Sequence, residues 1–274
     1  MEAHNQEKII QTYFSKYPLY LRLGENIKEA VENLLIEKGI ETISVNYRVK
    51  KLEQFLQKVE RKKCANPFEQ MTDICGIRVI CYLKKDIKKI EEIVGKEFEI
   101  VERNKKLSNL PLREFGYRSK HLIIKIKSDW AKTPNYRGLE NLKAELQIRT
   151  ILMHAWAEIE HKLSYKKAEH IPRELRRKFS RISAILEDAD EQFQEISDEV
   201  GAKKRKILTG LQEYKTSNRE INFDLDTLKI LLEYYFPGKV KDNKIMRDFF
   251  DEIAMSKITV KDLLELYKSK MEKK

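Results

Sequence analysis

The chain has 274 residues, of which 55 are Lys or Arg and 44 are Asp or Glu, so its formal net charge is +11. This length fits one large domain or a domain with an appendage, and a 41% share of hydrophobic residues in periodic runs excludes a disordered chain. The nine glycines form no G-x-G or G-x-x-x-x-G-K-[ST] run, which excludes Rossmann and P-loop phosphate sites. If the chain binds nucleotides, its side chains must contact the phosphates.

The charge, the cysteines and the lengths of the apolar runs indicate the cellular setting. A net charge of +11 favours a polyanionic partner, although a lysine-rich soluble surface explains it equally well. Three cysteines without a C-x-x-C pair favour a reduced, cytoplasmic chain over a disulfide framework or a cysteine zinc site. No apolar run has the length of a secretory signal or a membrane span, so we expect no membrane partner.

Hydrophobic spacing predicts helices and strands in alternation along most of the chain. Helices are expected at 5–39, 51–63, 84–95, 151–163, from Pro172 to about 200, and then at 225–235, 243–254 and 259–272. Strands are expected at 41–48, 74–82, 98–103, 121–127 and 142–149. The pattern predicts an α/β (mixed α+β) fold with a mixed β-sheet flanked by helices and a C-terminal helical extension. We expect N-terminal helices over 1–40, the core domain over 41–200 and a helical appendage over 201–274.

Two early segments carry candidate binding residues. Positions 46–63 hold seven basic residues against two acidic ones, which could neutralise a triphosphate; a solvated helix face is the competing interpretation. Asp73 and Arg78 flank the start of a predicted strand, where a metal-binding carboxylate would lie near a guanidinium that can stack on a base or bind phosphate. An Asp at this place can equally be only a turn former.

The segment 115–121 joins an aromatic ring to basic groups. Tyr117 follows Gly116, and Arg118 and His121 come directly after it. Such a loop suits stacking on a base with phosphates held around it. The alternative is a core tyrosine beside a turn glycine.

The strand 142–149 has an unusual polar face. Glu145, Gln147 and Arg149 alternate, so they share one face of the strand and need partners if that face is covered. The floor of an active site would satisfy this requirement, and an exposed sheet face is the competing account. In the helix that follows, His154, Glu158 and His161 share a face; its apolar neighbours favour support of the adjacent site over a zinc site.

Taken in order, five motifs resemble the synthetase domain of RelA/SpoT proteins. They are Arg48-x-Lys50, Asp73-x-x-Gly76-x-Arg78, Gly116-Tyr117-Arg118-Ser119-x-His121, Glu145-x-Gln147-Ile-Arg149-Thr150 and Glu158-x-x-His161-x-x-x-Tyr165-Lys166. The resemblance covers about residues 40 to 170, and it is specific because all five motifs occur in one order. It implies the nucleotidyltransferase-like fold of the alarmone synthetases.

In that family the β,γ-diphosphate of ATP is transferred to the 3′-hydroxyl of GTP or GDP, which gives AMP and pppGpp or ppGpp. The resemblance therefore implies a GTP pyrophosphokinase with ATP and GTP/GDP as substrates and Mg²⁺ as cofactor. None of the five histidines precedes an Asp, so the H-D motif of the family's hydrolase domain is missing. We expect synthesis without hydrolysis.

The resemblance also implies roles for individual residues. Asp73 and Glu145 would bind Mg²⁺, and Glu145 would also deprotonate the attacking hydroxyl. Arg48 and Arg78 would hold the adenine between them, and Tyr117 would stack on the acceptor base. The other residues expected to bind the nucleotides or their phosphates are Lys50, Lys58, Arg118, Ser119, His121, Gln147, Arg149 and His161.

Two other functions stay open. Some members of the superfamily pyrophosphorylate the 3′ end of tRNA, and five basic residues between positions 173 and 181 could bind an RNA backbone. A catalytically silent nucleotide-sensing scaffold is the third possibility, against which the presence of both Asp73 and Glu145 argues. The apolar stripes within 201–274 predict a homo-oligomer or a regulatory contact.

Overall fold

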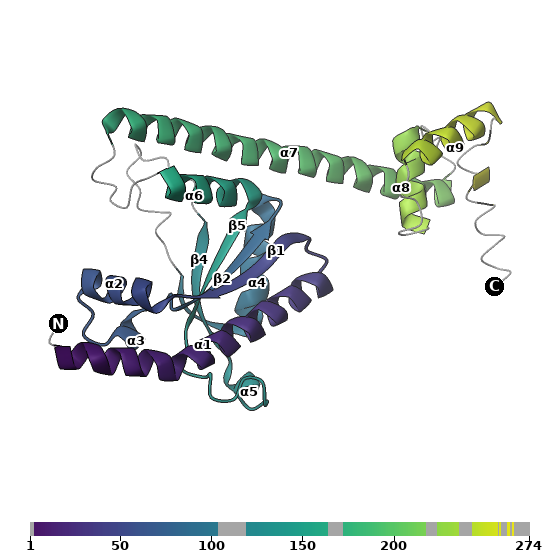
Figure 1. Cartoon of the computed structure of the whole chain (residues 1–274). Helices are drawn as coiled ribbons and strands as arrows, with labels where there is room; N and C mark the ends of the chain where they lie inside the picture. The colour runs from purple at the N-terminus through teal and green to yellow at the C-terminus, as the bar shows by residue number, and fades with distance from the viewer. Residues whose placement is uncertain are drawn as a thin grey trace. The chain divides into compact units, whose positions relative to one another are not determined.

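The computed structural model describes residues 3–103, 119–163, 172–217, 224–235, 243–256, 258, 262, 263 and 265 (Figure 1). The chain divides into two compact units, Met1–Gln194 and Glu195–Lys274. Within the described ranges, none of the helices combines the length and the apolar character that a membrane crossing requires.

The first unit contains a five-stranded sheet and the helices packed around it. Its strands are β1 (Thr42–Val49), β2 (Cys75–Cys81), β3 (Phe98–Arg103), β4 (Lys120–Ile126) and β5 (Ala144–Thr150). Its helices are α1 (Ala3–Glu37), α2 (Leu52–Lys62), α3 (Pro67–Gln70), α4 (Lys84–Glu97), α5 (Ser128–Ala131), α6 (Ile151–Leu163) and the first part of α7 (Arg173–Ser217). This architecture confirms the predicted mixed α/β fold class. The short helices α3 and α5 were not predicted, because four residues are too few to show a helical period.

The order of the strands is β1-β2-β5-β4-β3, and it brings distant motifs together. Strands β2 and β5 pair in parallel, while the other three pairs are antiparallel. In the parallel register Gly76 lies beside Glu145, and Arg78 lies beside Gln147. Because side chains alternate between the faces of a strand, these residues share one face of the sheet.

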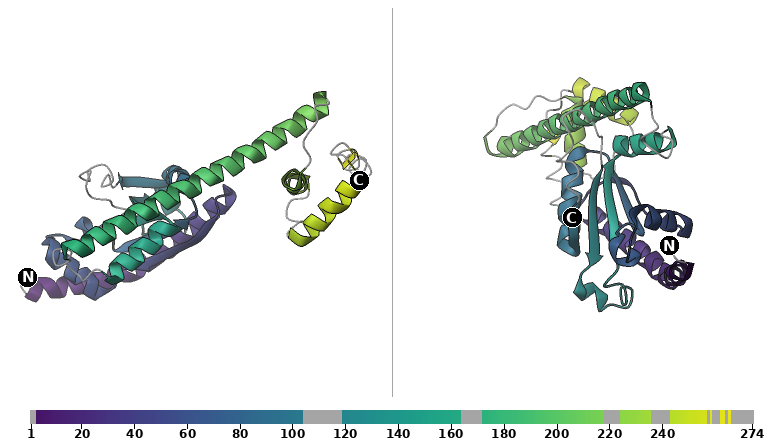
Figure 2. Two further views of the ribbon diagram at one scale, coloured as in Figure 1. Left: turned by 90° about the horizontal axis from the view of Figure 1, so that it is seen from above. Right: turned by 90° about the vertical axis from the view of Figure 1, so that its left-hand side faces the viewer.

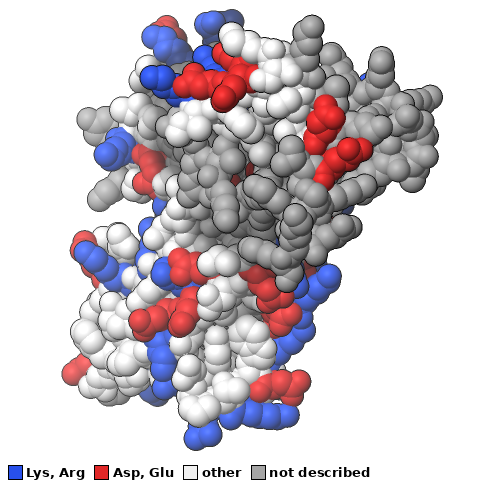
Figure 3. Space-filling model, turned by 90° about the vertical axis from the view of Figure 1, so that its right-hand side faces the viewer, with Lys and Arg blue, Asp and Glu red and all other residues white. Residues whose placement is uncertain are grey.

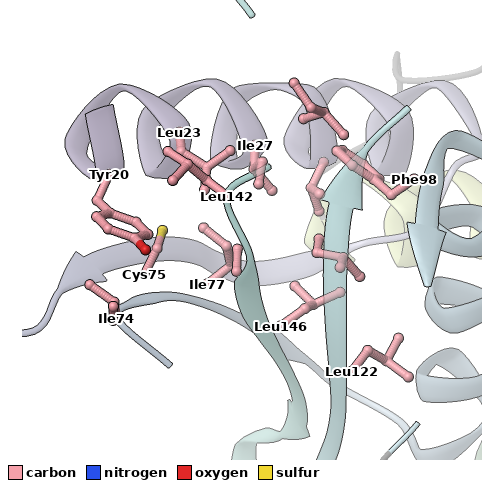
Figure 4. Close-up of a cluster of buried hydrophobic side chains, with 14 of the residues drawn as sticks. Tyr20, Leu23, Ile27, Ile74, Cys75, Ile77, Phe98, Leu122, Leu142 and Leu146 are labelled. Carbon is pink, nitrogen blue, oxygen red and sulfur yellow. The ribbon is translucent and has the colours of Figure 1, made fainter. Parts of the chain in front are cut away.

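The other face of the sheet forms the main core with α1 and α4. Leu23 and Ile27 of α1 lie over Ile77 of β2 and Leu146 of β5 (Figure 4), and each of the four is at most 1% exposed. Burying one such aliphatic side chain stabilises the fold by about 1.5–3 kcal/mol. The core therefore fixes β2 and β5, and with them the residues on their polar face.

Gly24 lies where α1 packs against β1. A Cβ at this position would lie 2.4 Å from Cδ2 of the Tyr47 ring, so the ring or the helix would have to shift. We expect Gly24→Ala to destabilise the protein by about 1–3 kcal/mol because of this overpacking, although Ala alone favours a helix by about 1 kcal/mol. Urea unfolding measures the change. Gly201→Ala is the control, because its Cβ would meet only a side-chain atom of Arg205 at 3.5 Å; a stabilised Gly24→Ala would contradict the packing.

On the polar face of the sheet, α6 packs against the first part of α7. Trp156 and Met153 of α6 are buried against Phe179 and Leu186 of α7, and the ring centroids of Trp156 and Phe179 are 5.8 Å apart. Glu158 of α6 pairs with Arg78 of β2 at 2.9 Å, so α6 also lies beside the polar residues of the sheet.

The second unit consists of the rest of α7, α8 (Leu225–Tyr235) and α9 (Asn243–Met255), with a small core around Leu228, Met246 and Ile253. The prediction that α7 ends near residue 200 is wrong, since the helix continues to Ser217 (Figure 2). A glycine inside a helix costs only about 1 kcal/mol, so Gly201 and Gly210 do not end it. The helix predicted at 259–272 lies mostly outside the described residues, and our division of the chain at residue 200 stays a proposal.

Candidate active site

A cavity of about 190 Å³ opens over the polar face of β1, β2 and β5. Five of the residues predicted to bind substrates or metal line it: Arg48, Asp73, Arg78, Glu145 and Gln147. The other lining residues are Asn46, Tyr47, Gly76, Ile77 and Glu158. The sheet order explains the convergence, because β2 and β5 are neighbours in space although the motifs on them are far apart in sequence.

Asp73, just before β2, is paired with two cations. The Lys50 ammonium lies 3.2 Å from Oδ2 of Asp73, and the Lys58 ammonium donates a hydrogen bond to the same oxygen. Burial raises the pKa of this carboxyl, but the hydrogen bond from Lys58 and the charge of Lys50 outweigh burial and hold the pKa below the ordinary value of 3.8. Asp73 is therefore ionised at neutral pH. Its other oxygen, Oδ1, is buried and has no hydrogen-bond partner in the described part of the chain.

Glu145 is the centre of a hydrogen-bonded row. Its Oε1 lies 3.1 Å from Nδ1 of His121, and its Oε2 accepts a hydrogen bond of 2.8 Å from Gln147. Arg149 donates to the Gln147 amide oxygen at 2.8 Å, and the Ser119 hydroxyl lies 2.7 Å from Nε2 of His121. Much of the hydrogen-bonding capacity of the polar face of β5 is therefore satisfied within this row. These side chains have the partners that a covered sheet face requires.

The environment of Glu145 also favours its ionised form. Burial raises the pKa of the carboxyl, but the hydrogen bond and charge of His121, together with the hydrogen bond from Gln147, bring it below the ordinary value of 4.5. The negative charge of Asp73 opposes these hydrogen bonds, because it raises the pKa of Glu145. Asp73 is thus close enough to influence the ionisation of Glu145.

Guanidinium groups crowd the other side of the site. Arg78 donates a hydrogen bond of 2.9 Å to Glu158 of α6. Burial, followed by the charge of Arg78, lowers the pKa of Arg149 to about 10. Burial and the same charge also lower the pKa of His154, which lies 3.8 Å from Glu158. On the surface face in Figure 3, described basic and acidic side chains are interspersed, whereas the site gathers its cations around two carboxylates.

The other residues predicted to bind nucleotides are His161, Tyr117 and Arg118. His161 is exposed in the last turn of α6. Tyr117 and Arg118 lie outside the described residues, so their roles stay predictions. Glu158 belongs to one of the motifs, but it was not among the residues predicted to bind nucleotides or metal. Its ion pair with Arg78 depends on how α6 packs, and this packing could not be predicted from the sequence.

The two carboxylates fit a magnesium site. Mg²⁺ prefers oxygen ligands and is usually bound by one or two carboxylates together with substrate phosphates and water. The unpartnered Oδ1 of Asp73 and the neighbouring Glu145 carboxylate offer such ligands. No group of three or more His, Cys, Asp or Glu side chains within the described ranges could bind a metal by itself, so the oxygens of a substrate would complete the coordination.

A larger cavity, of about 560 Å³, lies between the end of α1 and α4. Two of its lysines are paired with residues close along the chain: Lys89 lies 2.9 Å from Asp86, which also lines the cavity, and Lys38 lies 2.7 Å from Glu37. We assign the active site to the smaller cavity, because Asp73 and Glu145, the carboxylates predicted to bind Mg²⁺, line it together with Arg48 and Arg78.

Comparisons with known proteins show the family to which the chain belongs. Residues 47–170 match the family model described as a region found in RelA / SpoT proteins. The chain is also 32% identical over 188 residues to GTP pyrophosphokinase YjbM of Bacillus subtilis (strain 168), a match that covers 63% of this chain and 86% of that protein. The chain belongs to the RelA/SpoT family. The matched region of this RelA/SpoT chain contains every residue that lines the cavity except Asn46.

Solved structures confirm the expected fold. The crystal structure of small alarmone synthetase 1 from Bacillus subtilis is similar with a TM-score of 0.58 and 30% identity, over 69% of this RelA/SpoT chain and 98% of that one. The structure of the same synthetase bound to its product pppGpp has a TM-score of 0.57 and 30% identity, over 69% and 97% of the two chains. The chain therefore has the fold of the small alarmone synthetases.

Proposed function

We propose that the chain is a GTP pyrophosphokinase that transfers the β,γ-diphosphate of ATP to the 3′-hydroxyl of GTP or GDP. The 3′ oxygen forms a bond to the β-phosphorus, the bond between this phosphorus and the bridging oxygen of the α-phosphate breaks, and AMP leaves. The observation that carries the proposal is the pair of carboxylates, Asp73 and Glu145, within a cation-lined cavity of a RelA/SpoT chain. Phosphoryl transfer depends mainly on positioning and charge neutralisation, which such a cavity supplies.

Glu145 accepts the proton of the attacking hydroxyl in this proposal. The hydrogen bonds from His121 and Gln147 fix the orientation of its carboxylate. A lowered pKa makes a carboxylate a weak base, but phosphates bound beside it add negative charge and raise its pKa toward the value that proton transfer needs. A general base typically contributes about 10²–10⁴-fold to the rate.

Asp73 and Glu145 hold Mg²⁺ in this proposal, and the ion when bound neutralises charge on the phosphate oxygens. Lys50 and Lys58 converge on Asp73, which brings two ammonium groups to the same part of the site. Lysine side chains are flexible point charges, so these two can contact phosphates while remaining close to Asp73.

Arg48 and Arg78 hold the adenine of ATP between their guanidinium planes. Arg78 must first leave Glu158, whose side chain is 52% exposed. An ion pair of this exposure is worth at most about 1 kcal/mol, which stacking of a cation on an aromatic system can offset with about 0.5–2 kcal/mol. Tyr117 stacks on the acceptor base, and Arg118 and His161 contribute further binding contacts.

A labelling experiment tests the function and its alternatives. The purified protein is incubated with ATP labelled in its β- and γ-phosphates and with GTP, GDP or bulk tRNA. We expect label on GTP or GDP. Label on tRNA alone would assign the chain to the tRNA-modifying members of the superfamily, and label on no acceptor would favour the nucleotide-sensing scaffold.

Removal of divalent ions is expected to abolish the transfer. Without Mg²⁺ only the lysines and arginines neutralise the triphosphate, and the carboxylates of Asp73 and Glu145 repel it. In the same labelling assay EDTA should stop product formation, and excess Mg²⁺ should restore it. Full activity after extensive chelation would contradict the metal site.

We further propose that α7 pairs with α7 of a second copy. Large apolar side chains exposed at helical spacing form one stripe within the first unit: Leu175, Ile182, Ile185 and Phe193. Basic residues around Arg181 precede acidic residues around Glu187 on the same helix, so an antiparallel partner would place opposite charges together. Ile182→Glu should lower the mass measured by light scattering after gel filtration, whereas Ile36→Glu, on exposed α1 surface, should not. An unchanged mass for Ile182→Glu would contradict the pairing.

A reduced cytoplasmic compartment is the location that we propose. Cys64, Cys75 and Cys81 are all free thiols, as expected where disulfides do not form.

A further inference from the structure

Tyr13 of α1 contacts the backbone of an active-site lysine from 37 positions away. Its hydroxyl donates a hydrogen bond of 2.6 Å to the carbonyl oxygen of Lys50, and the Tyr13 side chain is only 4% exposed. The Lys50 N–H donates to the carbonyl oxygen of Ile74 at 2.8 Å. Both backbone groups of Lys50 are therefore held, although the residue lies just beyond the end of β1.

The position of this backbone determines where the Lys50 ammonium can reach. The ammonium lies 3.2 Å from Oδ2 of Asp73, and the Lys50 side chain is 15% exposed. Lysine has a long, flexible side chain, so its charge is only as well placed as its Cα and the groups around it. A shift of the chain at Lys50 would move this cation away from Asp73.

The ring of Tyr13 also supports the second cation. Its centroid is 5.3 Å from that of Phe55, at an angle of 40° between the rings, and Phe55 is fully buried on α2. Lys58 follows Phe55 by about one helical turn and donates to the same oxygen of Asp73. One buried side chain thus touches both segments that bring an ammonium group to Asp73.

We propose that Tyr13 is a positioning residue that sets Lys50 and Lys58 around Asp73, and thereby sets the affinity of the site for ATP with its metal. The inference rests on the proposed function, because it takes these lysines as phosphate-binding groups. Removing the Tyr13 hydroxyl leaves the Lys50 carbonyl oxygen without its donor, and a buried acceptor without a donor favours movement of the backbone.

Tyr13→Phe tests this, because it removes the hydroxyl and keeps the ring against Phe55. We expect the KM for ATP to rise about tenfold, with kcat and the KM for GTP nearly unchanged. A purely structural role would lower the folded fraction, which reduces the apparent kcat but leaves KM unaltered. An unchanged KM for ATP would overturn the proposal, even if the variant is less stable.

Tyr20→Phe is the matched control. Tyr20 belongs to the same helix and is also 4% exposed, but it lies against Cys75 in the core (Figure 4). This variant should keep the KM for ATP of the wild type. A rise equal to that of Tyr13→Phe would show that any tyrosine hydroxyl of α1 matters, which would overturn the specific role of Tyr13.

A double-mutant cycle tests whether Tyr13 acts through Lys50. In a Lys50→Met background, Tyr13→Phe should raise the KM for ATP by clearly less than it does alone, because the cation that it positions is gone. Fully independent effects of the two substitutions would overturn the coupling.

Calorimetry separates this inference from the proposed function. Binding of a non-hydrolysable ATP analogue with Mg²⁺ requires no turnover, and we expect Tyr13→Phe to weaken it by about tenfold. If the wild type binds the analogue but labels neither GTP nor GDP, the proposed function fails while the weaker binding of the variant still supports Tyr13. Equal affinity in the wild type and the variant overturns the role of Tyr13, whatever the acceptor.

Discussion

Glu145→Gln is expected to slow diphosphate transfer by about 10³-fold. The amide has nearly the volume of the carboxylate, but it carries no negative charge and cannot take a proton from the attacking hydroxyl. It also presents an NH₂ group where Glu145 accepts hydrogen bonds from His121 and Gln147, so one donor must lose its acceptor. Base, metal ligand and hydrogen-bond acceptor are lost together, which is why the expected effect is large.

The same substitution should leave the protein folded. Neutralising Glu145 removes its repulsion from Asp73, and this gain opposes the loss of the hydrogen bonds. Initial rates with labelled ATP measure the activity, and a thermal melt measures the fold. Glu99→Gln, the same change on exposed β3, serves as the control with wild-type rates. If the rate of Glu145→Gln is within about tenfold of the wild-type rate, the proposed catalytic role of Glu145 is contradicted.

The strands that carry the site could be predicted because their sequences are distinctive. Strand β2 is a mostly apolar run with β-branched residues at Ile77, Val79 and Ile80, as expected for a buried strand. The alternation in β5 correctly predicted that Glu145 and Gln147 share a face. The resemblance then grouped motifs that composition alone could not connect, and Arg48, Asp73 and Arg78 line the same cavity as these two.

Contacts between distant elements could not be predicted. The hydrogen bond from Tyr13 to Lys50 joins residues 37 positions apart, and neither residue stands out from its neighbours by type or spacing. Similarly, the sequence suggested Lys58 as a phosphate contact, but only the packing of α2 shows that its ammonium group donates a hydrogen bond to Asp73. Such pairs depend on how α1, α2 and the sheet pack, which local periodicity does not determine.

The end of α7 and the short helices α3 and α5 were also not predicted from the sequence. The helix α7 was expected to end near residue 200, yet the helical residues around Gly201 and Gly210 offset the cost of each glycine. The error in the predicted end of α7 affects only the appendage, because the residues of the site all lie on strands, on α2 and α6, or just beside these elements.

Asp73→Asn is expected to lower activity by a similar factor, about 10³-fold, but for a different reason. The substitution leaves Lys50 and Lys58 beside a neutral amide, and the metal loses one of two charged ligands. We therefore expect the Mg²⁺ concentration for half-maximal activity to rise as well. Activity measured across a Mg²⁺ titration tests both effects.

Asp129→Asn is the matched control, since Asp129 also pairs with a lysine, Lys132 at 2.8 Å, but on the exposed surface. That variant should keep wild-type activity and Mg²⁺ dependence. If Asp73→Asn loses activity with an unchanged Mg²⁺ dependence, Asp73 acts only by holding Lys50 and Lys58, and the metal assignment fails. If the Mg²⁺ requirement rises as well, the result supports Asp73 as a metal ligand, whose Oδ1 has no hydrogen-bond partner among the described residues.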